Sequence, residues 1–154
     1  MDEASFKLEP YIIKGWYVKG SRPTRTYALC KAQKIHVFGA LGFDGVMTKP
    51  SPKINAKKFL PFVRRLSKHN KKLCIIVDNA RWHLTKAIKA YLKEKDIKMI
   101  RLLTYSPELN PIEQYWKNIK QSLATKLIET KEDLIREVQY ALKKDIFIPK
   151  ISQY

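Results

Sequence analysis

Cysteine is scarce in this sequence, and its scarcity excludes a disulfide framework. Only Cys30 and Cys74 occur, and neither lies in a spacing that is typical of a metal site. Cys74 also falls inside an apolar segment, residues 73–77, where we expect it to be buried. The sequence therefore predicts two free thiols and a reducing compartment.

Long apolar runs are absent as well. No stretch of the sequence is long and apolar enough to span a bilayer. The chain opens with Asp2 and Glu3, whereas a secretory signal opens with basic residues before an apolar run. We therefore expect a cytoplasmic protein with no membrane partner.

Acidic residues are few compared with basic ones. The 14 Asp and Glu residues face 31 Lys and Arg residues, which leaves a net charge of +17 spread along the whole chain. Such an excess suits a long polyanion, and DNA is the leading candidate. An anionic membrane fits the charge but not the pattern, because no helix is predicted to be basic on one face and freely apolar on the other. We expect the protein to be associated with the nucleoid.

Low-complexity tracts, internal repeats and linkers are also missing. The 154 residues match one ordinary domain, and an apolar content of 45% is sufficient for a hydrophobic core. We therefore expect residues 1–154 to form a single domain.

The N-terminal third has the pattern of antiparallel strands. Apolar and polar residues alternate over 2–9 before Pro10, which predicts a first strand. A loop is expected over 15–23. The segments 34–43 and 46–49 then predict a hairpin that turns at Asp44-Gly45.

From Asn55 onward the pattern alternates between helices and strands. Apolar residues with helical spacing follow Asn55, and the continuous apolar run 73–77 predicts a strand that is buried on both faces. Further elements are expected as a helix over 84–92, a strand over 97–103 and helices that start at Asn110 and Thr130. Alternation of this kind favours parallel pairing through right-handed crossovers. The predicted fold class is α/β, with a mixed five-stranded sheet of the ribonuclease H-like type flanked by helices.

Two acidic residues stand at the ends of predicted elements. Asp78 closes the strand 73–77, and Glu113 is predicted as the third helical residue after an Asn110 cap and Pro111. Residues 79–112, 34 in number, separate them. Each acid alone could serve a structural role, Glu113 in a capping box and Asp78 in a turn. Together they are candidates for holding a divalent cation against a phosphate.

Three segments carry a resemblance to a known family. Val77-Asp78-Asn79-Ala80-Arg81-Trp82-His83 and Tyr105-Ser106-Pro107-Glu108-Leu109-Asn110-Pro111-Ile112-Glu113-Gln114-Tyr115-Trp116 resemble the second and third acidic motifs of mariner-type DDE transposases. The resemblance is to the bacterial and archaeal insertion-sequence branch in particular. The opening Met1-Asp2-Glu3-Ala4-Ser5-Phe6, followed by Gly15-Trp16, resembles the first acidic motif.

The resemblance implies a ribonuclease H-like domain that cuts and joins DNA strands at transposon ends. Asp2, Asp78 and Glu113 would be the catalytic residues and would hold two Mg²⁺ or Mn²⁺ ions, for which carboxylates are preferred ligands. Arg81 and His83 would face the site or the DNA, although a lone His near a helix start is more often a packing or capping group. The partners implied are DNA and, as one option, a second copy of the chain.

Two departures from the family pattern leave other functions open. We identify no helix-turn-helix domain before the catalytic segment, and only Met1 precedes Asp2, so the first ligand is expected to be frayed and metal binding weakened. Glu3 is expected on the opposite strand face from Asp2, with no part in the site. The alternatives are a silent transposase fragment that binds DNA nonspecifically or pairs with full-length transposase, and a ribonuclease H or junction-resolving nuclease on the same fold.

Overall fold

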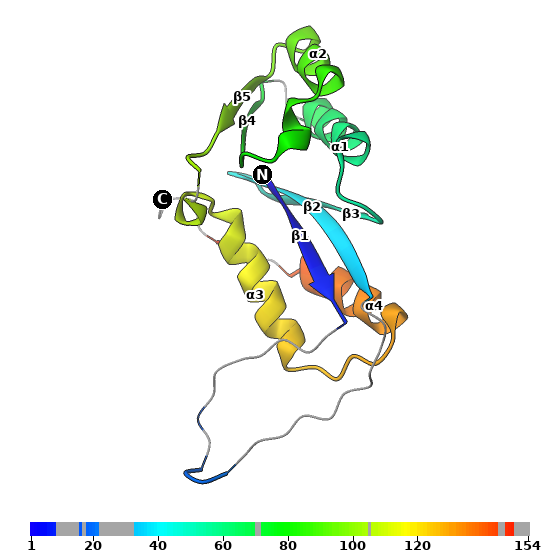
Figure 1. Cartoon of the computed structure of the whole chain (residues 1–154), viewed down its shortest axis with the longest axis vertical. Coiled ribbons are helices and arrows are strands. Elements are labelled where there is room, and N and C mark those ends of the chain that lie inside the picture. Colours follow the sequence, from blue (N-terminus) through cyan, green and yellow to red (C-terminus); the bar gives the residue numbers. More distant parts are fainter. Residues whose placement is uncertain are drawn as a thin grey trace.

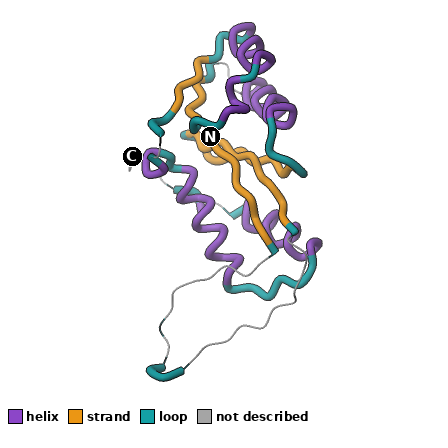
Figure 2. Tube along the Cα trace, viewed as in Figure 1, coloured by secondary structure: helices purple, strands orange, loops and turns teal. Residues whose placement is uncertain are grey.

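The computed structural model describes residues 1–8, 16, 18–21, 33–69, 72–104, 106–144 and 147–149. The three N-terminal strands occupy the centre of the molecule, with helices on either side of them, and two shorter strands lie near its upper edge (Figure 2). The amino terminus lies near the middle, where the upper group of α1, α2, β4 and β5 approaches the strands β1 to β3 (Figure 1). The predicted loop over 15–23, Cys30, Glu9 and Pro10 fall wholly or largely outside the described residues.

Three antiparallel strands form the first sheet, as predicted. They are β1 (Asp2–Lys7), β2 (Lys34–Gly42) and β3 (Gly45–Ser51), in the order β1-β2-β3. The hairpin turns at Phe43 and Asp44, one residue earlier than predicted, because Gly42 pairs with Gly45. Gly45 has a φ of +119°, a backbone conformation that favours glycine.

The second half begins with a helix and continues as a parallel unit. α1 (Ala56–His69) leads to β4 (Cys74–Val77), and the short helix η1 (Arg81–Leu84) leads to α2 (Lys86–Glu94) and β5 (Lys98–Arg101). β4 and β5 pair in parallel, which confirms the predicted parallel pairing.

Two further helices complete the chain after the short helix η2 (Pro107–Leu109). α3 (Ile112–Ala124) starts one residue later than predicted, with Pro111 at its cap and no side-chain hydrogen bond there, so the predicted Asn110 side-chain cap is wrong. α4 (Lys131–Leu142) begins with the predicted capping box of Thr130 and Asp133.

The core consists of two hydrophobic clusters on opposite faces of β1 and β2. The α3–α4 cluster joins these two helices to β1 and β2, and its largest buried side chains are those of Trp116, Tyr115 and Phe6. The α1–α2 cluster joins those helices to β2 and to the β4–β5 pair, through residues such as Phe38, Phe62 and Val77. Val37 and Phe38 belong to different clusters because neighbouring side chains of a strand point to opposite faces.

Two predictions about the strands are not borne out. Hydrogen bonding gives a three-stranded sheet and a separate two-stranded sheet among the described residues, rather than one sheet of five strands. The Met1 ammonium donates to the carbonyl oxygen of Ile76 at 2.9 Å, where the two sheets meet.

β4 is also half buried rather than buried on both faces. Ile75 and Val77 point into the α1–α2 cluster, whereas Cys74 and Ile76 are exposed. Helices cover only one face of the β4–β5 pair, so its second apolar face meets solvent.

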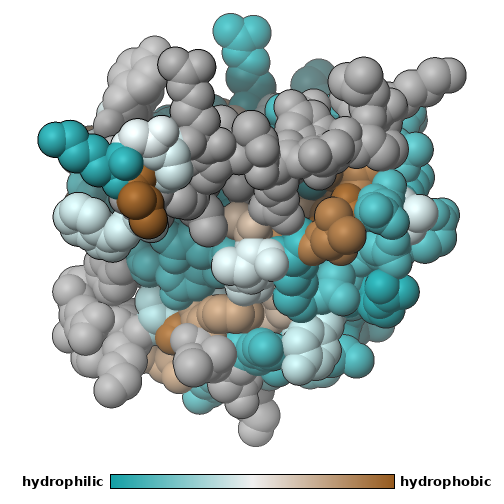
Figure 3. Space-filling view, turned by 90° about the horizontal axis from the view of Figure 1, so that it is seen from below, coloured by the Kyte–Doolittle hydropathy of each residue, from teal (hydrophilic) through white to brown (hydrophobic). Residues whose placement is uncertain are grey.

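The coloured surface seen from below shows hydrophobic residues separated by hydrophilic ones (Figure 3). None of the helices in the described ranges combines the length and the apolar character that crossing a bilayer requires.

Candidate active site

Asp2 and Glu3 open β1 and point to its two opposite faces. Asp2 lies on the same face as Ala4 and Phe6, toward α3, and is only 8% exposed. The indole nitrogen Nε1 of Trp116 donates a hydrogen bond to Asp2 Oδ2 at 3.2 Å. The predicted first acid is therefore buried and tied to the third helix.

The absence of a side chain at Gly39 makes room for this contact. Gly39 pairs with Asp2 across the β1–β2 ladder. A Cβ atom at Gly39 would lie 2.5 Å from ring atoms of Trp116, well inside van der Waals contact. Glycine at position 39 thus allows the indole to cross β2 and reach Asp2.

The pKa of Asp2 is raised to about 7: burial is the largest cause, and the negative charges of Glu113, Glu3 and Asp78 also raise it, against a backbone hydrogen bond from Glu3 that lowers it. The effect of these three charges shows that four carboxylates gather around the start of β1. None of the described Lys or Arg residues forms an ion pair with Asp2 or Glu113.

Asp78 follows β4 at the edge where the parallel pair ends, as predicted. Its Oδ1 accepts a hydrogen bond from the backbone N–H of Ala80 at 3.0 Å. The amide of Asn79 donates to the carbonyl oxygen of Leu102 at 2.6 Å, which fastens the end of β4 to the chain after β5. The Asp78 side chain is 47% exposed, so its carboxylate can receive a ligand from solvent.

Glu113 lies in the first turn of α3 and is exposed. Its backbone N–H donates to the carbonyl oxygen of Asn110 at 2.9 Å. An acid in the first helical turn is stabilised by the positive end of the helix dipole. Its effect on Asp2 places the two carboxylates near each other, as the sequence predicted for the start of this helix.

His83 is buried on η1, and both of its ring nitrogens meet acids. Nε2 lies 3.0 Å from Glu3 Oε1, and Nδ1 lies 3.2 Å from Asp78 Oδ1. One ligand atom from each of Glu3, Asp78 and His83 lies within 4.8 Å of the other two, the one such group found among the described residues. The prediction that Glu3 has no part in the site is therefore wrong: it points away from Asp2, but η1 brings His83 to that face.

Arg81 is exposed on η1, three residues after Asp78. Its contact with DNA stays a prediction.

The sequence did not predict that Trp116 and Glu3 lie next to the site. The segment that resembles the third acidic motif does, however, end at Trp116.

The donor atoms fit a hard divalent cation. Asp2, Asp78 and Glu113 offer carboxylate oxygens, which Mg²⁺ and Mn²⁺ prefer, and they come from three elements that meet at the start of β1. A cation there would also compensate the mutual repulsion that contributes to the raised pKa of Asp2.

Comparison with solved structures finds several with a similar fold. The Mos1 chain of a strand transfer complex matches 95% of this chain at 20% identity, with a TM-score of 0.72. The Mos1 catalytic domain with raltegravir and Mg matches 94% at 16% identity and a TM-score of 0.57. The catalytic core domain of BIV integrase matches 71% at 18% identity and a TM-score of 0.50, with 72% of that domain covered.

These structural matches show the fold: a mixed α/β arrangement similar to that of the Mos1 catalytic domain. The chain spans 47% of the Mos1 chain in the strand transfer complex and 71% of the separate catalytic domain. Among curated proteins, none matches the sequence. The expected assignment to the bacterial and archaeal branch stays a prediction.

A family model provides the assignment. The model described as DDE superfamily endonuclease matches residues 1–135, which include Asp2, Asp78, Glu113 and every strand of the structure. This match confirms the family resemblance that the acidic motifs indicated. The chain therefore belongs to the DDE superfamily endonucleases.

Proposed function

We propose that this chain is the catalytic domain of a transposase that cuts and joins DNA strands, with Asp2, Asp78 and Glu113 as the metal-binding catalytic residues. The observation that carries the proposal is the convergence of these acids, where Glu113 and Asp78 both raise the pKa of a buried Asp2. The family and the Mos1 fold support it. Two Mos1 paired-end complexes are described with Mn and with Mg, which supports a divalent cofactor here.

Each acid would make a different contribution to the reaction. Asp2 is held by Trp116 and Asp78 by the Ala80 N–H, so both are fixed in direction before a substrate binds. Glu113 is exposed at the helix start and can close the site from the third side. Two bound Mg²⁺ or Mn²⁺ ions would activate the attacking hydroxyl and stabilise the leaving oxygen of an in-line displacement.

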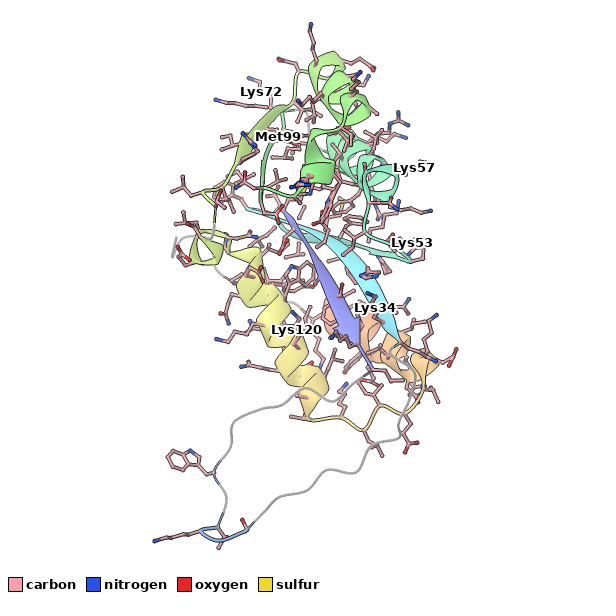
Figure 4. All side chains as sticks on the ribbon, in the orientation of Figure 1. Lys34, Lys53, Lys57, Lys72, Met99 and Lys120 are labelled. Carbon is pink, nitrogen blue, oxygen red and sulfur yellow. The ribbon has the colours of Figure 1, made fainter. Side chains whose placement is uncertain are left out.

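Positive charge supports DNA as the substrate. The net charge is +17, and lysines lie along the whole length of the molecule, among them Lys72, Lys57, Lys34 and Lys120 (Figure 4). Arg81 on η1 adds a cation close to Asp78. DNA binding should therefore weaken steeply as salt increases, because each phosphate contact releases counterions.

The test is nicking of a supercoiled plasmid in Mn²⁺ by the wild type and by Asp78→Asn and Glu113→Gln. We expect each substitution to reduce the nicking rate at least 100-fold, because each removes a metal ligand. Glu132→Gln is the matched control, since Glu132 is also an exposed acid in the first turn of a helix. Nicking that persists in Asp78→Asn would contradict the proposal.

A second candidate function is a silent fragment that binds DNA without cutting it. The observation that favours it concerns the spacing of the three proposed ligands. Among the described residues, the group with all ligand atoms within 4.8 Å of one another is Glu3, Asp78 and His83, and it includes neither Asp2 nor Glu113. Salt-sensitive DNA binding by a wild type that does not nick in Mn²⁺ would favour this function. Preferential cutting of RNA–DNA hybrids or four-way junctions would favour the other nuclease types on this fold.

A further inference from the structure

We propose that His83, held in place by Glu3, is a positioning residue that aims the Asp78 carboxylate toward the cation. The proposal rests on the proposed function, because it assigns Asp78 as a metal ligand. It concerns the pair Glu3 and His83, which the acidic motifs alone do not explain.

The contacts of Asp78 divide its two carboxylate oxygens. Oδ1 accepts from the Ala80 N–H at 3.0 Å and lies 3.2 Å from His83 Nδ1. Oδ2 has no hydrogen-bond partner among the described residues. Two contacts on one oxygen fix the plane of the carboxylate and leave the other oxygen available for a ligand.

His83 has little freedom to move away from this position. Its side chain is 1% exposed, and its ring lies 4.4 Å from that of Phe59, centroid to centroid. Nδ1 is closer to the carboxylate of Asp78, at 3.2 Å, than to its carbonyl oxygen, at 3.5 Å. The side chain thus contacts Asp78 from within the core, where packing fixes the rotamer.

Glu3 holds the other end of the ring. Glu3 Oε1 lies 3.0 Å from Nε2, and its side chain is only 4% exposed. A buried carboxylate needs a donor, and among the described residues the ring of His83 lies within reach of this one. Nε2 thus faces Glu3 and Nδ1 faces Asp78, so β1 and the end of β4 are linked through a single side chain.

This arrangement resembles in kind the outer contacts that orient metal ligands in other proteins. Such partners fix ligand direction, and their loss costs metal affinity without removing a ligand. Asp2 has the equivalent support from Trp116. Each aspartate of the proposed centre therefore has one buried aromatic nitrogen that holds it.

Two substitutions of His83 distinguish the contact that Nδ1 makes with Asp78 from the contact that Nε2 makes with Glu3. His83→Asn places an amide nitrogen near the position of Nδ1 and can still donate to Asp78, whereas His83→Gln reaches toward Nε2 and can contact only Glu3. Mn²⁺ affinity is measured from the free-ion electron paramagnetic resonance signal, with a thermal melt in metal-free buffer for each variant. We expect His83→Gln to bind Mn²⁺ about tenfold more weakly, and His83→Asn to stay within about threefold of wild type.

Equal Mn²⁺ affinities for the two variants would overturn the proposal, whether both match the wild type or both lose binding. Should neither variant fold, Glu3→Gln decides, because it keeps the shape of the side chain. We expect it to weaken Mn²⁺ binding several-fold with an unchanged melting temperature, and an unchanged affinity would overturn the proposal. Asp78→Asn is measured in parallel: wild-type affinity there would refute the metal site itself, whereas loss there with no difference between the His83 variants would refute only the positioning role.

Discussion

The α3–α4 cluster and the α1–α2 cluster hold their aspartates in different ways. On the α3–α4 side, Asp2 is buried and its carboxylate meets the Trp116 indole. On the α1–α2 side, Asp78 stands at an exposed strand end, and its Oδ1 contacts Ala80 and the buried His83. The same chemical group is thus supplied once from within the core and once from its edge.

The difference shows how the site draws on both halves of the molecule. β1 has one face in each half, so Asp2 belongs to the first and Glu3 contacts the second. β2 also contributes to both clusters, through Val37 and Phe38. A displacement of either cluster should therefore be felt at the site, which the following substitutions test.

The largest effect is expected when a buried ring is removed from either cluster. Phe6→Ala on the α3–α4 side and Phe62→Ala on the α1–α2 side both truncate fully buried side chains. Each should lower the free energy of unfolding by about 3–5 kcal/mol, measured by urea denaturation. Phe43→Ala is the control, since Phe43 is 95% exposed. Two separate transitions in either variant would show that the clusters unfold independently.

A smaller effect is expected at the close approach of β2 and α3. Gly39→Ala places a methyl group 2.5 Å from the Trp116 ring, which must shift. We expect a loss of about 1–3 kcal/mol in unfolding free energy. Gly42→Ala is the matched control, because its nearest atom would be 4.0 Å away. Equal stabilities of the two variants would contradict the tight packing above Asp2.

The pKa of Asp2 predicts how stability depends on pH in metal-free buffer. Its pKa rises from 3.8 to about 7 on folding, so between these values the folded chain holds a proton that the unfolded chain lacks. The free energy of unfolding should therefore fall as pH rises through this interval, by at most about 1.4 kcal/mol per pH unit, and level off above it. Asp2→Asn should remove this contribution. Parallel pH profiles for the variant and the wild type would exclude the shift.

The smallest effect is expected from the indole donor alone. Trp116→Phe removes the N–H that meets Asp2 Oδ2 and replaces the bicyclic indole with a smaller ring. We expect the lost donor to cost about 1 kcal/mol in unfolding free energy, to which the space left by the smaller ring adds, and we expect a further rise in the pKa of Asp2, because the charged form loses a donor. The pKa is measured by carboxyl ¹³C nuclear magnetic resonance. A lower pKa in the variant would contradict the contact.

Much of the fold follows from local pattern. Alternation over residues 2–7 and the hairpin at residues 34–51 predicted the antiparallel sheet, and helical spacing predicted the buried faces of α1 and α3. Strand periodicity also placed Glu3 opposite Asp2. Periodicity says which face a residue occupies, but not what another element brings to that face, so the contact of Glu3 with His83 escaped prediction.

The burial of strand β4 also could not be predicted from local pattern. A continuous apolar run is typical of strands covered on both faces, and on that basis Cys74 was expected to be buried. α1 and α2 cover one face only, and the second is exposed. Burial depends on which helices pack against a strand, and this is a property of the assembled chain.

By itself, the sequence determined the element order, the two acids at a strand end and a helix start, and the excess of positive charge, because these depend on local spacing and composition. The tertiary structure alone decided that Trp116 reaches Asp2 past Gly39, and that His83 joins Glu3 to Asp78. The contacts of Trp116 with Asp2 and of His83 with Glu3 span 114 and 80 positions of the sequence, and the fit at Gly39 depends on the space between two packed elements. No local pattern specifies any of these.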